Sequence, residues 1–155
     1  MKIIKANHIA ECPRIAIVVS RFNENITTAL LTGALNRFKE LEIDTRFISI
    51  AYVPGAVEIP IVAQQFAQTG EYDAILAIGA VIRGETSHYD YVCQQVSYGC
   101  QKVMLKHNIP VIFSVLTTDT EEQALARVGG AHGHKGHDCA DTALEMISVF
   151  KQLKQ

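Results

Sequence analysis

The segment VIRGETSH at 81–88 places an arginine, a glutamate, two hydroxyls and a histidine directly after the apolar run DAILAIGA at 73–80. If a helix begins near residue 88, the amides at 84–86 face outward without partners, which suits a phosphate. One of the two hydroxyls could instead form a plain helix cap, and Glu85 would have to point away from a bound phosphate. The residues alone therefore leave a phosphate site and a helix cap as alternatives.

Three other side chains have the right chemistry for a site. His88 would lie in the first helical turn, where the helix dipole disfavours a positive charge and so suits a proton acceptor, although a capping role is also open. Phe22 follows a strand end amid polar residues and could stack on a planar ligand or fold back onto the next helix. Arg127 lies beside a glycine-rich loop and could bind a phosphate through its guanidinium, or it could only contact backbone carbonyls at the C-terminus of a helix.

His132, His134 and His137 resemble a metal cluster, because imidazoles bind zinc and nickel. No cysteine or carboxylate accompanies them at a recognised ligand spacing, so we assign no metal.

The elements that must position these residues follow from hydrophobic periodicity. Four apolar, β-branched runs alternate with segments of helical period, which predicts successive βαβ units and a parallel sheet between two layers of helices. We expect one α/β domain over residues 1–155, with strands at 14–20, 45–53, 73–80 and 110–116. The helices are expected at 26–41, from Pro60 in a first turn to Gly70, at 88–107, over 120–127 behind a capping box of Thr120 and Gln123, and at 138–153.

In such a sheet the loops that follow the strands all lie along one edge, where ligands bind. That edge comprises residues 21–23, 54–58, 83–88 and 117–119, so the polarity of the VIRGETSH segment is explained by its place at the edge.

Composition argues against several classes of protein. A net charge of −2, with scattered lysines and arginines, does not favour nucleic acid. No apolar run approaches the ~20 residues that span a bilayer, and no secretory leader is recognisable, so we expect a cytoplasmic protein. The four cysteines form no CxxC pair and are expected to be free thiols. A content of 48% hydrophobic residues indicates self-association.

Five motifs in order give the whole chain a close resemblance to the lumazine synthases of riboflavin biosynthesis. They are IVVSRFNENIT, YVPGAVEIP, GAVIRGETSHYDYV, PVIFSVLTTD and ALARVGGAHGHKGHDCADTALEM. The resemblance implies a flavodoxin-like, three-layer α/β/α fold with a four-stranded parallel sheet. It also implies a transferase that condenses 5-amino-6-ribitylaminouracil with 3,4-dihydroxy-2-butanone 4-phosphate, giving 6,7-dimethyl-8-ribityllumazine, phosphate and water without a cofactor.

The resemblance also implies roles for individual residues. The pyrimidine and ribityl chain would be held by Phe22, Ala56, Val57, Glu58, Val81, Ile82 and Lys135, and by Phe113 and Ser114 from a neighbouring subunit. The phosphate would be held by Gly84, Glu85, Thr86 and Arg127. His88 would transfer protons, and Asp138 would lie near Lys135. Val57, Tyr52 and Gly130-Ala131 depart from the commonest family pattern, and Val57 would loosen one wall of the pyrimidine pocket.

For assembly, the resemblance implies homopentamers, pairs of pentamers or a hollow icosahedral shell of sixty subunits. The short loop at 129–137 favours the shell, the segment MKIIKANHI could add a strand to a neighbour's sheet, and riboflavin synthase is a possible partner. Two alternatives stay open, an archaeal-type riboflavin synthase and a non-catalytic flavin-binding or shell-forming homologue. A nucleotide-binding Rossmann domain would need a GxGxxG motif, which the chain lacks.

Overall fold

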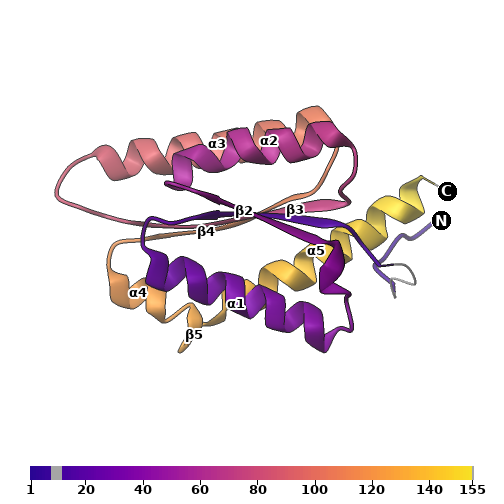
Figure 1. Ribbon diagram of the computed structural model, residues 1–155, viewed down its shortest axis with the longest axis horizontal. Helices are drawn as coiled ribbons and strands as arrows, with labels where there is room; N and C mark the ends of the chain where they lie inside the picture. Colours follow the sequence, from indigo (N-terminus) through magenta and orange to yellow (C-terminus); the bar gives the residue numbers. More distant parts are fainter. Residues whose placement is uncertain (8–11, 155) are drawn as a thin grey trace.

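A central parallel sheet organises the chain, as the computed structural model in Figure 1 shows. The structure describes residues 1–7 and 12–154. The sheet has the order β2-β1-β3-β4, so β2 and β4 are its edges. Its strands are β1 (Ile15–Ser20), β2 (Ile48–Val53), β3 (Ala74–Ile82) and β4 (Val111–Thr118).

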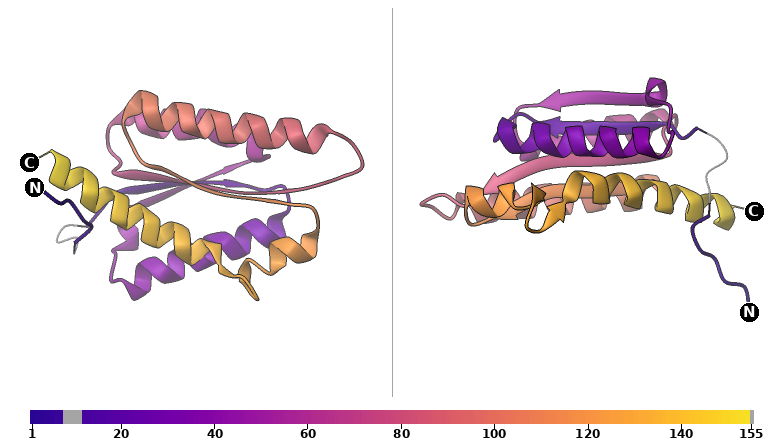
Figure 2. Two further views of the ribbon diagram at one scale, coloured as in Figure 1. Left: turned by 180° about the vertical axis from the view of Figure 1, so that it is seen from behind. Right: turned by 90° about the horizontal axis from the view of Figure 1, so that it is seen from below.

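Helices cover both faces of the sheet, which confirms the predicted three-layer α/β/α fold (Figures 1 and 2). One face carries α1 (Glu24–Glu40) and α5 (Lys135–Leu153), and the other carries α2 (Ile59–Thr69) and α3 (His88–His107). The remaining elements are short: η1 (Thr45–Phe47), η2 (Ala56–Glu58), α4 (Glu121–Leu125), β5 (Val128–Gly130) and β6 (Gly133–His134).

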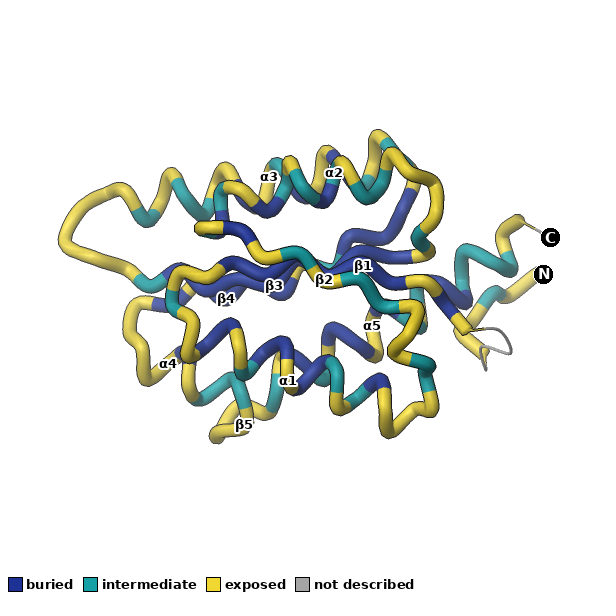
Figure 3. The backbone as a smooth tube through the Cα atoms, viewed as in Figure 1, coloured by how far each residue is buried: buried dark blue, intermediate teal, exposed yellow. Residues whose placement is uncertain are grey.

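The core consists of two apolar layers, one on each side of the sheet (Figure 3). Along β1, Ile15, Ile17 and Val19 pack toward α1 and α5, while Ala16 and Val18 pack toward α2 and α3. This alternation follows from the two-residue period of a strand, and burial on both faces explains why β1 and β3 are continuous apolar runs.

Several predicted helix ends are confirmed. Pro60 lies in the first turn of α2, and Gly70 ends that helix with a φ of 69°, where a residue without Cβ is favoured. The Thr120 hydroxyl accepts a hydrogen bond from the Gln123 amide at 3.2 Å, and the Gln123 side chain accepts one from the Asp119 amide at 2.8 Å.

The structure corrects several predicted boundaries. Helix α1 begins at Glu24 rather than at residue 26, and β3 and β4 extend two residues further, to Ile82 and Thr118. Residues 45–47 form a 3-10 turn rather than the start of β2, because the Asp44 carboxylate accepts a hydrogen bond from the Arg46 amide. The loop at 129–137 contains the β5–β6 hairpin. Helix α5 begins at Lys135 rather than at 138, because the His134 side chain caps it.

The N-terminal segment lies beside the last helix. The Asn7 amide donates to the Ser148 hydroxyl at 2.8 Å, and the Gln152 side chain donates to the Lys5 carbonyl at 2.6 Å. Residues 1–7 form no strand in the isolated chain, and residues 8 and 9 of the predicted strand lie outside the described residues. Within the described part of the chain, no helix has the length and apolarity needed to cross a membrane.

Candidate active site

A cavity of about 630 Å³ opens at the carboxyl edge of the sheet, between the ends of β1 and β3 and the start of α3. We call it the edge cavity, and its volume is typical of a site for a small molecule. Nine of the residues selected from the sequence line it: Phe22, Ala56, Val57, Glu58, Val81, Ile82, Gly84, Thr86 and His88.

Phe22 presents its ring to the edge cavity because the turn after β1 is held in place. Its amide donates to the Pro54 carbonyl at 3.1 Å, which joins the ends of β1 and β2. The next residue, Asn23, has a left-handed backbone with φ 58°, and its side chain donates to the Ala80 carbonyl at 2.9 Å. The Phe22 side chain is 70% exposed, so it is not folded back onto α1 and is free to stack on a ligand.

The wall after β2 is the turn η2. The Glu58 amide donates to the Gly55 carbonyl at 3.3 Å, so the chain doubles back just before α2 begins. Ala56 is buried, Val57 is half-buried and the Glu58 carboxylate is exposed. This wall therefore offers backbone amides and one carboxylate, groups that suit the hydroxyls of a polyol chain.

The loop before α3 keeps its amides free. The Thr86 hydroxyl accepts a hydrogen bond from the His88 amide at 3.3 Å, while Ser87 makes no side-chain cap. Among the described residues, none accepts a hydrogen bond from the amides at 84–86. The cap and the anion site are therefore compatible, and Glu85 is exposed and does not line the cavity.

Seven lining residues were not among the selected site residues. Asn23 and Gly55 lie within the predicted edge segments at 21–23 and 54–58, whereas five were not predicted there: Ala80, Tyr89, Tyr91, Val92 and Gln95. Residues 91, 92 and 95 follow His88 by three, four and seven positions, so the helical period starting from His88 was the signal that identifies them. Burial raises the pKa of the Tyr89 phenol, and its near neighbour Arg83 partly opposes that shift.

A second group of selected residues lies elsewhere, in a cleft of about 350 Å³ that we call the β4–α5 cleft. Phe113 and Ser114 from the edge strand β4 line it, together with Lys135 and Asp138 from α5. The Lys135 ammonium donates to the Asp138 carboxylate at 2.8 Å. No residue lines both the edge cavity and this cleft, so one chain does not bring the two groups together.

Arg127 lines neither hollow, but its backbone belongs with the second group. Its carbonyl accepts a hydrogen bond from the Lys135 amide at 2.8 Å. Arg127 is half-buried, and its guanidinium donates to the Gln123 carbonyl at 2.8 Å, as expected for an arginine at a helix C-terminus. The remaining donors of that guanidinium can still bind an anion, because an arginine has five N–H groups.

The histidine-rich loop packs against α1 rather than gathering around an ion. The rings of His134 and His137 are stacked with centroids 4.7 Å apart, and the Gly136 amide donates to His134 Nδ1 at 3.1 Å. Burial, and then the nearby His137, lower the pKa of His134. The described residues contain no group of three or more histidines, cysteines and acids arranged to hold a metal.

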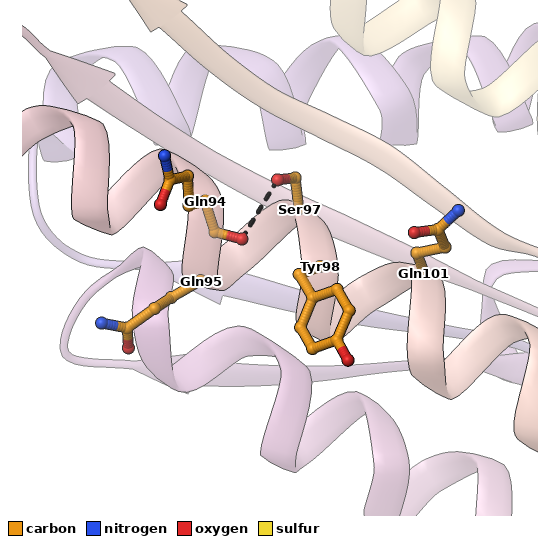
Figure 4. A pocket seen from close by; sticks show the side chains of 5 residues that line it. All are labelled: Gln94, Gln95, Ser97, Tyr98 and Gln101. Carbon is orange, nitrogen blue, oxygen red and sulfur yellow. Dashed lines mark hydrogen bonds between the residues drawn. The ribbon is translucent and has the colours of Figure 1, made fainter.

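A third hollow lies on the outer surface of α3 (Figure 4). Only amide, hydroxyl and phenol side chains line it: Gln94, Gln95, Ser97, Tyr98 and Gln101. The Ser97 hydroxyl donates to carbonyls of its own helix, as the dashed line to Gln94 shows. Because it is open and lacks a carboxylate, imidazole or cationic group, this hollow is a weaker candidate than the edge cavity.

Comparison with known proteins agrees with the motifs. A family model described as 6,7-dimethyl-8-ribityllumazine synthase matches residues 13–151. A 6,7-dimethyl-8-ribityllumazine synthase from Coxiella burnetii strain Dugway 5J108-111 is 54% identical over 141 residues, covering 91% of this chain and 93% of the relative. Proteins of the same name from strains CbuG_Q212 and RSA 493 are 53% identical over the same coverage. The chain therefore belongs to the 6,7-dimethyl-8-ribityllumazine synthase family.

Proposed function

We infer that this protein is a transferase of riboflavin biosynthesis that condenses 5-amino-6-ribitylaminouracil with 3,4-dihydroxy-2-butanone 4-phosphate. The products are 6,7-dimethyl-8-ribityllumazine, phosphate and water. The main structural support is the edge cavity, where an exposed aromatic ring, a polar turn, a loop of free amides and a histidine surround one space. The family match disfavours an archaeal-type riboflavin synthase and a non-catalytic homologue.

The pyrimidine and its ribityl chain occupy the part of the edge cavity near β1 and β2. The Phe22 ring stacks on the pyrimidine, and the backbone of Val81 and Ile82, at the end of β3, pairs with its polar edge. Ala56, Val57 and Glu58 hold the ribityl hydroxyls, which suits a turn with a carboxylate and backbone groups on its surface.

The phosphate of the butanone binds at the start of α3. The amides of Gly84, Glu85 and Thr86 and the Thr86 hydroxyl are the donors, since a helix N-terminus carries free N–H groups and partial positive charge. Arg127 adds a guanidinium, whose planar donors match a phosphate bidentately.

His88 transfers protons between the two bound substrates. The aromatic amine attacks the ketone, and loss of water gives an imine. The phosphate group then leaves by elimination, the resulting enol becomes a ketone, and the ribitylamino nitrogen closes the ring on that carbonyl with loss of a second water. Alignment of the two substrates contributes up to ~10 kcal/mol in favourable cases, and a positioned proton acceptor typically adds about 100- to 10,000-fold in rate. These steps require no electron transfer, so the proposal includes no cofactor and no metal.

We place the complete active site between two subunits. The β4–α5 cleft carries Phe113, Ser114, Lys135 and Asp138, with Arg127 adjacent through its bond to Lys135, yet it is separate from the edge cavity. Phe113 is 44% exposed on an edge strand, and an aromatic side chain so placed is a natural contact for a second copy. The neighbour's cleft would then close one side of the edge cavity.

The assembly we propose is a homopentamer that forms a sixty-subunit shell. Exposed apolar side chains distributed over several elements support extensive self-association: Tyr52, Ile61, Tyr91, Tyr98 and Leu105. The short β5–β6 hairpin agrees with the shell rather than the free pentamer. We further propose that residues 1–155 act as a single domain in the cytoplasm, that MKIIKANHI pairs with a neighbouring sheet, and that riboflavin synthase is a partner.

A steady-state assay with both substrates tests this function, following lumazine absorbance and phosphate release. Equal amounts of both products are expected from the wild type. His88→Ala is expected to lower kcat, and Arg127→Ala is expected to raise KM for the butanone phosphate. His107→Gln, at the other end of α3, and Arg46→Ala, at the amino edge of the sheet, are matched controls. A wild-type rate equal to the uncatalysed condensation would refute the proposal.

A further inference from the structure

Arg83 lies inside the VIRGETSH segment but is not one of the residues that line the edge cavity. It stands between Ile82, at the end of β3, and Gly84, the first residue of the phosphate loop. We define the phosphate loop as residues 84–87. Within its own chain, Arg83 therefore reaches the edge cavity only through its neighbours.

The Arg83 side chain joins two separate segments of the fold. Its Nε donates to Asp119 Oδ1 at 2.8 Å, just beyond β4, and its Nη1 lies 3.3 Å from Asp90 Oδ1, in the first turn of α3. Its guanidinium carbon also lies 4.1 Å from the centroid of the Tyr89 ring. The Arg83 amide donates to the Thr118 carbonyl at 2.9 Å, so backbone and side chain both attach to the end of β4.

The phosphate loop has little support of its own. Every residue in it is exposed, and a Cβ added at Gly84 would meet no atom within 4 Å beyond the two adjacent residues. Its position is therefore determined at its two ends, by Arg83 before it and by the first turn of α3 after it. One guanidinium connects both of these ends to β4.

The charges around Arg83 argue against direct phosphate binding. Two carboxylates, Asp90 and Asp119, flank the single guanidinium, so the cluster carries no excess positive charge to attract an anion. The hydrogen bond that Arg83 donates to Asp119 is also the main reason why the pKa of Arg83 is raised. Arg83 therefore contributes to phosphate binding through the geometry of the loop and not through its own charge.

We propose that Arg83 is a positioning residue that holds the phosphate loop in the orientation in which its free amides receive the phosphate of the butanone. This inference rests on the proposed function, since it concerns the same phosphate. Asp119 is the main partner of Arg83 in this role, because it provides the shorter ion pair and lies on a different segment from the loop.

Arg83→Ala is the direct test. KM for the butanone phosphate and the inhibition constant of inorganic phosphate are both expected to rise about tenfold. The free energy that corresponds to a tenfold change is within the range of two exposed ion pairs acting together. KM for the pyrimidine is expected to stay within about twofold, because the aromatic side of the edge cavity does not depend on the loop. Asp119→Asn is expected to shift the same constants in the same direction, and the double variant is expected to add little to Arg83→Ala.

Hydrogen exchange gives a readout that is independent of turnover. In the unliganded Arg83→Ala variant, the hydrogen-bonded amides at the two ends of the phosphate loop, at 83, 88 and 90, are expected to exchange about tenfold faster, while those of β1 are unchanged. Arg83→Lys, which retains the charge but can satisfy only one carboxylate well, is expected to give an intermediate effect. Arg46→Ala removes an exposed arginine ion pair at the opposite edge of the sheet and is expected to leave all these values unchanged.

Two results would overturn the positioning role. One is a proportional rise of both KM values in Arg83→Ala, which would indicate general damage to the fold. The other is unchanged exchange at amides 83, 88 and 90, which would show that the ends of the loop do not depend on Arg83. An inactive wild type would instead refute the proposed function, and the exchange data would still decide whether Arg83 orders the loop.

Discussion

Replacing Gly33 with alanine tests how closely α1 and α5 approach each other at the point where His134 caps the last helix. A Cβ at position 33 would lie 2.0 Å from His134 Cε1 and 2.6 Å from each ring nitrogen. Atoms cannot approach so closely, so either the helices separate or the His134 ring leaves its place. Overpacking of this kind costs about 1–3 kcal/mol. Displacing the ring would lose the hydrogen bond from the Gly136 amide, a cap worth ~1 kcal/mol.

An opposing term is the higher helix propensity of alanine, which contributes about 1 kcal/mol relative to glycine. The expected net effect of Gly33→Ala is a loss of about 1–2 kcal/mol, or a fall in Tm of roughly 3–6 °C for a chain of this size. Thermal unfolding followed by circular dichroism measures this, at one protomer concentration throughout because self-association adds stability.

The decisive comparison uses His134→Ala as a second background. With the ring removed, the three atoms nearest to the new Cβ are gone, and Gly33→Ala is expected to stabilise the chain by about 1 kcal/mol through helix propensity alone. The change of sign between the two backgrounds is the signature of the contact. Stabilisation by Gly33→Ala in both backgrounds would refute the close packing described here.

The remaining predictions concern pH, thiols and a helix cap. Burial, and then His137, lower the pKa of His134, so as the pH falls the unfolded chain binds a proton at this imidazole before the folded chain does. The contribution of His134 to the free energy of unfolding is therefore fully present above about pH 6.5 and declines as the pH falls below that value. In denaturant titrations between pH 7 and 5, His134→Asn is expected to keep the cap and reduce this slope; an unchanged slope would assign the pH dependence to other groups. Burial raises the pKa of Cys100 to about 12 and that of Cys139 to about 11, so a thiol reagent at pH 8 is expected to modify exposed Cys12 first and these two only after unfolding. Rapid native modification of Cys100 or Cys139 would contradict this accessibility. Thr120→Ala is expected to cost ~1 kcal/mol by removing the α4 cap, with Thr120→Ser close to wild type, and equal melting temperatures for both variants would show that the cap is not formed.

The parallel sheet made much of the edge cavity predictable. Once every strand is expected to run in the same direction, Phe22, the turn at 56–58 and the segment at 81–88 must share one edge, and the structure places them there. Tyr91 and Gln95 were also within reach of sequence reasoning, because they repeat at helical spacing from His88.

Other features depend on contacts that a local pattern does not contain. The separation of Phe113 and Lys135 from the edge cavity follows from the position of β4 as an edge strand, which long-range pairing with β3 determines. The β5–β6 hairpin requires positive φ values of 105° at Gly129 and 75° at Gly133, and a glycine-rich loop gives no local sign of which residues adopt them. The early start of α5 depends on His134 as its N-cap residue, and histidine is not among the residue types that usually predict an N-cap.

The pairing of the N-terminal segment with α5 has a practical consequence for attaching other molecules to this protein. Lys5 and Asn7 contact Gln152 and Ser148, and Figures 1 and 2 show the first and last segments leaving the fold together. They do so at the amino edge of the sheet, opposite the edge cavity. A fluorophore, affinity tag or cargo protein joined through either segment therefore emerges from the same end of each subunit and leaves the entrance to the edge cavity unobstructed.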